Sequence, residues 1–141
     1  MLISNATTIF FDFDGVIKDS VRVKSEAFEK LFSSFGDKAS KKVRRHHESN
    51  GGMSRFEKIP IYLEWVNLPS TPIVVGKFSN EFSKLVMQKV IDSEWVPGVL
   101  NFIENNYKIK NLFIVTATPQ SEIEEIISRI GIAKCFKKII G

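Results

Sequence analysis

The chain has 141 residues, of which 43% are hydrophobic and 26% are charged, and its formal net charge at pH 7 is +4. This length suits one globular domain, or a small core with an inserted subdomain. No apolar run approaches the roughly 18 residues of a membrane span, and the sequence does not open on a basic region followed by a long apolar segment. We therefore expect a soluble cytoplasmic protein without a membrane partner.

Basic residues concentrate in two segments, 38–47 and 134–138. Neither segment shows the interleaved exposed aromatics typical of a nucleic-acid site, so no nucleic-acid partner is expected. A solvated basic surface is the favoured interpretation, and a field that attracts a small phosphorylated substrate is the alternative. The single cysteine, Cys135, has no CxxC partner and is interpreted as an inert packing residue.

Residues 7–13 form a continuous β-branched and aromatic run, which predicts a buried strand of a parallel sheet. Apolar positions in the next part of the chain recur at steps of three and four residues, with glycine and proline at the breaks. Ser54 is placed to cap one helix and Pro72 to begin another. The helices predicted in this part span residues 20–35, 38–50, 54–66 and 72–91.

The remaining sequence alternates between helix and strand. A helix is predicted at residues 99–107, a buried strand at 111–117, a helix around the isoleucines of 123–130, and a short strand at 137–141. This order and spacing form the α/β pattern, whose parallel strands carry their active residues at the carboxyl ends.

These elements divide the chain into two predicted domains. Residues 1–19 and 92–141 are expected to form a Rossmann-like parallel sheet core, which is incomplete at its C-terminal side. Residues 20–91 are expected to form an inserted α-helical cap.

Two carboxylates, Asp12 and Asp14, follow the first predicted strand, and Thr116 lies at the end of the second. Because the carboxyl ends of parallel strands meet at one edge, we expect these residues to share a crevice. A carboxylate between Phe11 and Phe13 would be buried unless it is solvated, paired or bound to a cation. Mg²⁺ with oxygen ligands would be such a cation, and Asp12 could then attack a phosphate held by it.

Several segments give the chain a family resemblance. The stretch "FFDFDGVIKDS" resembles the first motif of the haloacid dehalogenase superfamily, a hydrophobic strand followed by DxDG and a DS pair. The stretch "LFIVTAT" resembles its second motif. The stretches "VPGVLNFIENN" and "IISRIGIAKCFKKIIG" are similar to flanking segments of the phosphoglycolate phosphatase and β-phosphoglucomutase branch, which carries a helical cap. The resemblance runs along the whole chain.

The resemblance implies a role for each motif residue. Asp12 would be the nucleophile that forms an aspartyl-phosphate, and Asp14 would protonate the leaving oxygen and then activate water. The Asp12 carboxylate and the Asp14 backbone carbonyl would hold Mg²⁺, while Thr116 would donate to the phosphoryl group. Gly15 would let the backbone approach the substrate, and Ala117 lies where relatives often carry a polar substrate contact. Asp14 favours phosphate esters, because dehalogenases expel halide without a proton donor.

The predicted cap carries "HHESNGGMSRFEKI", which resembles the substrate-specificity loop of this branch. Arg55 and Lys58 are the candidates for binding a second anionic group of the substrate, and a solvated surface position is the alternative for both. His46 and His47 are adjacent, so they point apart on a helix, and we interpret both as structural. Thr118 is expected to act as a helix N-cap rather than as a ligand.

The third family motif is a lysine and the fourth is an acidic pair, and neither has a matching residue here, since Lys137 and Lys138 precede the last predicted strand. In the family, the strand that carries the nucleophile lies between two others, one of which belongs to the fourth motif. We therefore expect residues 7–13 to form an apolar edge strand, which invites pairing with another chain. A fragment, a truncated gene product and a homo-oligomer that covers this edge are the interpretations left open.

The predicted function is that of a Mg²⁺-dependent phosphatase, acting through an aspartyl-phosphate on a small phosphorylated metabolite such as a sugar phosphate. One alternative is a phosphomutase, which must keep water away from the aspartyl-phosphate. The other is a catalytically inactive module that keeps the fold for binding or assembly.

Overall fold

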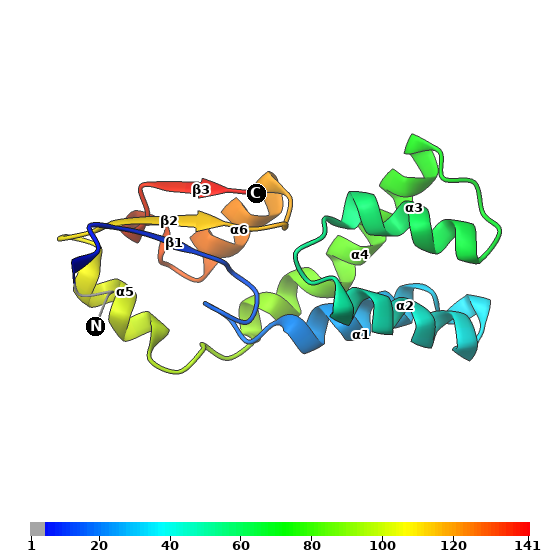
Figure 1. Cartoon of the computed structure of the whole chain (residues 1–141), viewed down its shortest axis with the longest axis horizontal. Coiled ribbons are helices and arrows are strands. Elements are labelled where there is room, and N and C mark those ends of the chain that lie inside the picture. Colours follow the sequence, from blue (N-terminus) through cyan, green and yellow to red (C-terminus); the bar gives the residue numbers. More distant parts are fainter. Residues whose placement is uncertain (1–4) are drawn as a thin grey trace. The chain divides into compact units, whose positions relative to one another are not determined.

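The computed structural model describes residues 5–141 of the chain (Figure 1). It contains a parallel sheet and a set of helices, in the order that the sequence predicts. The strands are β1 (Thr8–Phe11), β2 (Asn111–Val115) and β3 (Lys138–Ile140). The helices are α1 (Val21–Leu31), α2 (Asp37–Ser49), α3 (Arg55–Trp65), α4 (Pro72–Asp92), α5 (Val99–Asn106) and α6 (Gln120–Arg129), with 3₁₀ turns η2 (Ser33–Phe35) and η3 (Ala133–Cys135).

The chain divides into two compact units. The sheet unit comprises the residues up to Ser20 together with Val90–Gly141, and the helical unit comprises Val21–Lys89. None of the helices within residues 5–141 combines the length and the apolar character that crossing a membrane requires.

The sheet unit holds three parallel strands in the order β1-β2-β3 (Figure 1). Phe11 of β1 pairs with Ile114 of β2, and Ile114 pairs in turn with Ile139 of β3. The connections from β1 to β2 and from β2 to β3 both step in the same direction across the sheet. Connections between parallel strands are usually right-handed, which places α5 and α6 over the same face. The α/β fold predicted from the alternation of strands and helices is therefore confirmed.

Only one face of this sheet is buried. Phe11 packs edge-on against Phe102 of α5 and against Phe136, with ring centroids 6.1 and 6.0 Å apart. On the opposite face Phe10 is 64% exposed and stacks on Phe113 at 5.0 Å. Side chains alternate between the faces of a strand, so a strand covered by helices on one side only cannot be buried throughout.

We call the uncovered apolar surface the open face; it consists of Phe10, Phe113, Val115 and Ile140. The prediction of a fully buried first strand is wrong for Phe10, whereas the prediction that this strand lies at an edge is confirmed.

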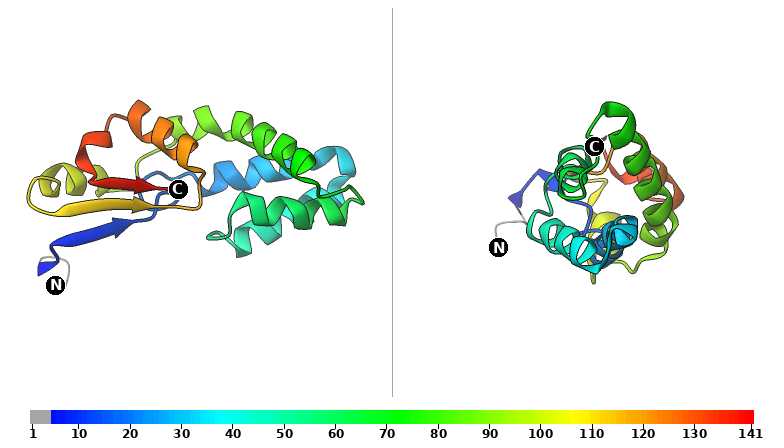
Figure 2. Two further views of the ribbon diagram at one scale, coloured as in Figure 1. Left: turned by 90° about the horizontal axis from the view of Figure 1, so that it is seen from above. Right: turned by 90° about the vertical axis from the view of Figure 1, so that its right-hand side faces the viewer.

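The helical unit is built around a cluster of aromatic side chains in tilted and edge-on contact. Phe28 of α1 lies 4.1 Å from Phe82 of α4 and 5.5 Å from Tyr62 of α3, between ring centroids. Ser54 caps α3 through a capping box with Glu57, as its position in the sequence predicts. Figure 2 shows the helices of this unit from two further directions.

Some element ends differ from the prediction. The helix expected at residues 20–35 stops at Leu31, and the 3₁₀ turn η2 continues it. Cys135 is buried in the turn η3, and burial raises the pKa of its thiol, with a smaller opposing effect from Lys134. A thiol with a raised pKa holds less thiolate at neutral pH, in agreement with the inert role inferred for it.

The open face and the unpaired edge of β1 predict self-association of the chain. Apolar surface and unpaired backbone groups together favour contact with a second copy. We expect wild-type protein at micromolar concentration to sediment faster than a monomer, and Phe10→Lys to shift it toward the monomer. Ile73→Lys is the matched control, since Ile73 is exposed on α4 of the helical unit. A wild-type protein that stays monomeric at every concentration would contradict the expectation.

Candidate functional site

The predicted catalytic residues lie at one edge of the sheet. β1 ends at Phe11, directly before Asp12, and β2 ends at Val115, directly before Thr116. Because the two strands are parallel neighbours, with Phe11 paired to Ile114, these carboxyl ends fall at the same edge (Figure 1). The structure thus brings Asp12 and Thr116 to neighbouring strand ends.

Asp12 is exposed, although Phe11 and Phe13 on either side of it are buried. Its Oδ1 accepts a hydrogen bond from the backbone N–H of Phe13 at 2.6 Å. The Asp12 carboxylate is therefore solvated, which is one of the three ways in which this apolar run could contain a charged group. The exposed carboxylate is available to a ligand.

Asp14 and Gly15 belong to a tight turn that follows Asp12. Gly15 has a φ of 75°, a conformation that favours glycine, and its N–H donates to the carbonyl of Lys18 at 2.8 Å. Asp14 is half-buried, and its Oδ1 accepts a 2.6 Å hydrogen bond from the hydroxyl of Ser20. Ser20 was not among the predicted site residues; its only signal in the sequence was its place in the DS pair.

The other side of this edge is formed by residues 116–118. The Thr116 N–H donates to the carbonyl of Ile140 at 2.9 Å, and the Thr116 hydroxyl accepts from the Thr118 N–H at 3.2 Å. Thr118 is buried and does not cap α6, whose N-cap is Pro119 and receives no side-chain cap. The N-cap prediction is therefore wrong, because Thr118 is engaged with Thr116 instead. Ala117 is exposed between them.

Arg55 and Lys58 lie on α3 and neither is a solvated surface residue. Arg55 is 5% exposed, donates to the hydroxyl of Ser83 at 2.6 Å and lies 4.6 Å from the ring centroid of Phe82. Lys58 is 1% exposed, with its Nζ 3.0 Å from Nδ1 of His47. The surface alternative considered for these two residues is wrong, since both cations are held inside the protein.

The two histidines have structural contacts. His46 Nδ1 lies 3.0 Å from the hydroxyl of Tyr62, whose pKa is raised by burial. His47 packs against Phe28 with ring centroids 4.8 Å apart, in addition to its contact with Lys58. Each ring contributes to the packing of the helical unit.

A family assignment follows from comparison with known proteins. The model of the haloacid dehalogenase-like hydrolase family matches residues 9–141. The chain belongs to this family. It is 27% identical over 135 residues to a phosphorylated carbohydrates phosphatase of Thermotoga maritima, across 94% of the chain and 59% of that relative.

Solved structures of haloacid dehalogenase-like proteins share the fold. A haloacid dehalogenase-like hydrolase of Bacteroides fragilis superimposes with a TM-score of 0.72 at 18% identity, over 97% of this chain and 63% of that one. A β-phosphoglucomutase of Clostridium difficile superimposes with a TM-score of 0.71 at 22% identity, over 95% and 60%. The chain therefore spans about three fifths of the length of these relatives.

Haloacid dehalogenase-like hydrolases generally use Mg²⁺, and the residues at the strand ends fit this ion. Mg²⁺ is commonly bound by one or two carboxylates together with water and substrate phosphate oxygens. The exposed carboxylate of Asp12 supplies such a ligand, and the turn at Asp14 adds oxygen atoms nearby in the chain. A cluster of three or more His, Cys, Asp or Glu able to hold a metal is not found within residues 5–141.

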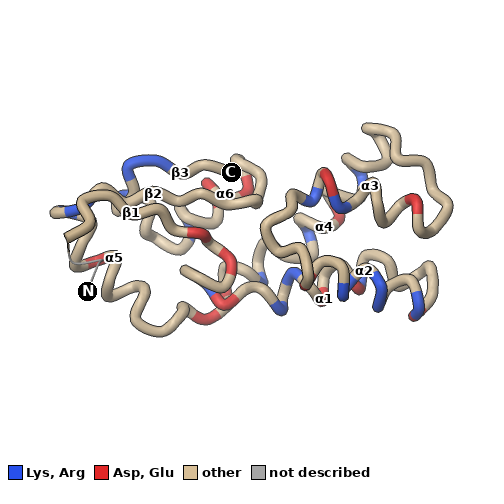
Figure 3. The backbone as a smooth tube through the Cα atoms, in the orientation of Figure 1, with Lys and Arg blue, Asp and Glu red and all other residues tan. Residues whose placement is uncertain are grey.

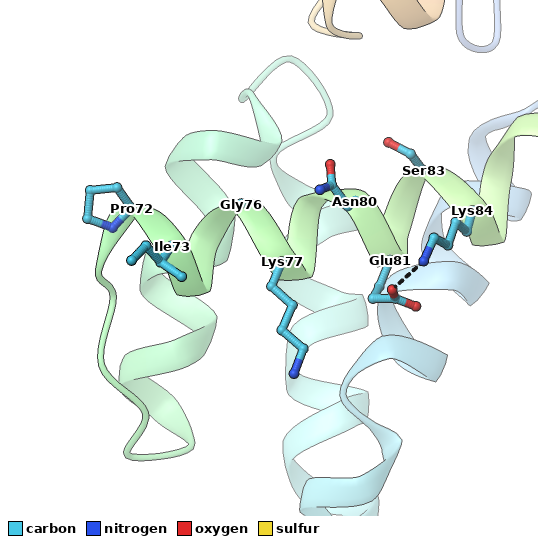
Figure 4. A pocket seen from close by; sticks show the side chains of 8 residues that line it. All are labelled: Pro72, Ile73, Gly76, Lys77, Asn80, Glu81, Ser83 and Lys84. Carbon is cyan, nitrogen blue, oxygen red and sulfur yellow. Dashed lines mark hydrogen bonds and ion pairs between the residues drawn. The ribbon is translucent and has the colours of Figure 1, made fainter.

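Two surface features of this haloacid dehalogenase-like chain lie outside the predicted catalytic residues. An open groove runs along α4 between Pro72 and Lys84, where Lys84 pairs with Glu81 at 2.8 Å (Figure 4). Basic residues lie along α2 and at the start of β3 (Figure 3). On α2, Arg44 pairs with Glu29 at 2.7 Å, which contributes to a raised pKa of its guanidinium. Neither feature contains a residue of the predicted catalytic set.

The burial of Arg55 predicts a large effect of its removal on stability. Arg55→Ala loses a hydrogen bond from a charged donor and the contact with Phe82, so we expect the free energy of unfolding to fall by about 2 kcal/mol. Arg22→Ala is the matched control, because the side chain of Arg22 is 82% exposed and pairs only with Glu26 of its own helix among the ion pairs found. Urea denaturation measures both, and equal effects would contradict the structural role of Arg55.

Proposed function

We propose that the site at the strand ends hydrolyses a phosphate monoester, with Asp12 as nucleophile and Asp14 as general acid and base. The observation that carries this proposal is the exposed carboxylate of Asp12 at the carboxyl end of a parallel strand, with Thr116 at the end of the neighbouring strand. Open α/β sheets bind their ligands at this edge. Membership of a hydrolase family adds support.

The reaction requires two displacements at phosphorus. An Asp12 carboxylate oxygen forms a bond to phosphorus while the bond to the ester oxygen breaks, and Asp14 gives its proton to that oxygen. Asp14 then takes a proton from water as the water oxygen attacks the aspartyl-phosphate. Inorganic phosphate leaves, and Asp12 returns to its carboxylate form.

The charge on the transferred phosphoryl group needs positive partners and donors. Bound Mg²⁺, held by the Asp12 carboxylate and the Asp14 backbone carbonyl, would neutralise part of this charge. The hydroxyl of Thr116 would donate to a phosphoryl oxygen, and the exposed residues Gly15 and Ala117 would line the substrate pocket. The Thr116 hydroxyl accepts from the Thr118 N–H at 3.2 Å and donates to the Thr118 hydroxyl at 3.4 Å, so its proton would have to turn from this long contact toward the phosphoryl oxygen.

The proposed substrate is a small phosphorylated carbohydrate. The Thermotoga maritima relative is named as a phosphatase of such compounds. The guanidinium of Arg55 and the ammonium of Lys58 suit a second anionic or hydroxyl-rich part of the substrate, but both side chains are buried and would have to exchange their contacts with Ser83 and His47 for that group.

A phosphate-binding module without turnover is the second candidate. Lys138 begins β3 and so lies at the amino end of its strand, opposite to the edge that carries Asp12. A phosphomutase is a third possibility within the same chemistry, and product analysis with a phosphorylated hexose separates it from the phosphatase.

The first test is Mg²⁺-dependent release of phosphate from an aryl phosphate. Asp12→Asn removes the nucleophile, so we expect turnover to fall by at least about a hundredfold. Asp19→Asn is the matched control, because Asp19 is an exposed aspartate of the same segment with no part in the proposed mechanism. Phosphate binding without turnover, unchanged in Asp12→Asn, would instead support the binding module.

The second test concerns substrate choice. Replacement of Arg55 by Lys keeps the charge but not the planar pair of donors, so we expect KM for a phosphorylated hexose to rise about tenfold while KM for an aryl phosphate changes little. Steady-state kinetics on both esters measure this ratio. An equal rise of KM for the phosphorylated hexose and for the aryl phosphate would show that Arg55 acts through folding rather than through substrate binding.

A further inference from the structure

Ser20 makes a short side-chain contact with Asp14 in the turn that follows Asp12. It is fully buried, and its hydroxyl lies 2.6 Å from Asp14 Oδ1 and 3.3 Å from the carbonyl of Lys18. A hydroxyl has one proton, and the 2.6 Å contact has the length typical of an O–H donor bound to a carboxylate. The hydroxyl of Ser20 is therefore directed mainly at Asp14.

Backbone hydrogen bonds hold Ser20 in this place. Its N–H donates to the Lys18 carbonyl at 2.9 Å, and the same carbonyl accepts from Gly15 at 2.8 Å. The N–H of Asp19 donates to Glu94 at 2.8 Å, and Val96 donates back to Ile17 at 3.1 Å. The turn is thus tied both to itself and to the segment that follows α4.

A buried cation strengthens the same attachment. Lys18 is 3% exposed and its Nζ lies 4.6 Å from the ring centroid of Trp95. Burial lowers the pKa of Lys18, while the charges of Glu94 and Asp92 raise it in part. The contact with Trp95 and the two carboxylates offset part of the cost of burying the ammonium group. Ser20 therefore lies in a segment that is held by backbone hydrogen bonds and by the contact between Lys18 and Trp95.

We propose that Ser20 is a positioning residue that fixes the Asp14 carboxylate for proton transfer, an inference that rests on the function proposed for Asp14. With Oδ1 bound to the Ser20 hydroxyl, rotation of the carboxylate is restricted, and the proton that Asp14 gives to the leaving group is presented in one orientation. A general acid transfers its proton efficiently only when it is held within hydrogen-bond distance of the acceptor. Loss of the hydroxyl should therefore weaken acid catalysis more than substrate binding.

The test compares two esters that differ in their need for an acid. A hexose phosphate expels a basic alkoxide that needs the proton of Asp14, whereas a nitrophenyl phosphate expels a stable phenolate. We expect Ser20→Ala to lower kcat/KM about tenfold for the hexose phosphate and less than about twofold for the nitrophenyl ester. Ser20→Thr keeps the hydroxyl and should restore the wild-type ratio.

Ser25→Ala is the matched control. Ser25 is also buried, but its hydroxyl donates to the backbone carbonyl of Val21 at 3.1 Å, so its loss should leave the ratio between the esters unchanged. Equal losses on both esters in Ser20→Ala, or no recovery in Ser20→Thr, would overturn the positioning role while the function of the active wild type stands. If the wild type shows no Mg²⁺-dependent turnover that Asp12→Asn abolishes, the proposed function fails, and the role of Ser20 in it is overturned as well.

Discussion

The parallel register between β1 and β2 is the constraint on which the candidate site depends. Phe11 pairs with Ile114, so the chain leaves both strands at one edge, with Asp12 on one side and Thr116 on the other. A slip of one residue would turn Phe11 toward the open face and displace Asp12 relative to Thr116. The packing of Phe11 against Phe102 and Phe136 opposes such a slip. The apolar contacts under the sheet thus fix the position of polar residues at its end.

The turn after β1 adds a second level of order at the same edge. A positive φ at Gly15 lets the chain reverse, and the hydrogen bonds to Lys18 close the turn. Burial of a lysine is costly, and a stable core does not require it. Functional sites often retain polar groups that disfavour folding. The buried Lys18 beside Trp95 is consistent with such a site. The turn thus fixes the position of the Ser20 hydroxyl relative to the Asp14 carboxylate.

Local sequence signals predicted most of the fold. Ser54 and Pro72 marked the starts of α3 and α4 because capping and proline geometry act within a few residues. The ends of β1 could not be predicted from local sequence, because they depend on which residues of β2 pair with it. This pairing is set by contacts between residues that are distant in the sequence. The same holds for Ser20 and for the burial of Arg55. A motif indicates which side chains carry the chemistry, but the hydrogen bonds that orient them depend on the folded neighbours.

The strand that presents the proposed nucleophile lies at an edge of the sheet, as does β3 on the other side. Within the described part of the chain, residues 5–141, β1 pairs only with β2, and the alternation that buries Phe11 leaves Phe10 exposed on the open face. Asp12 directly follows this strand. The position of Asp12 therefore depends on the hydrogen bonds between β1 and β2 and on the packing of the buried face of the sheet. Any polypeptide that covers Phe10 would exclude water from the open face and restrict the motion of β1. Association at this surface and the placement of the Asp12 carboxylate are therefore linked through the same short strand.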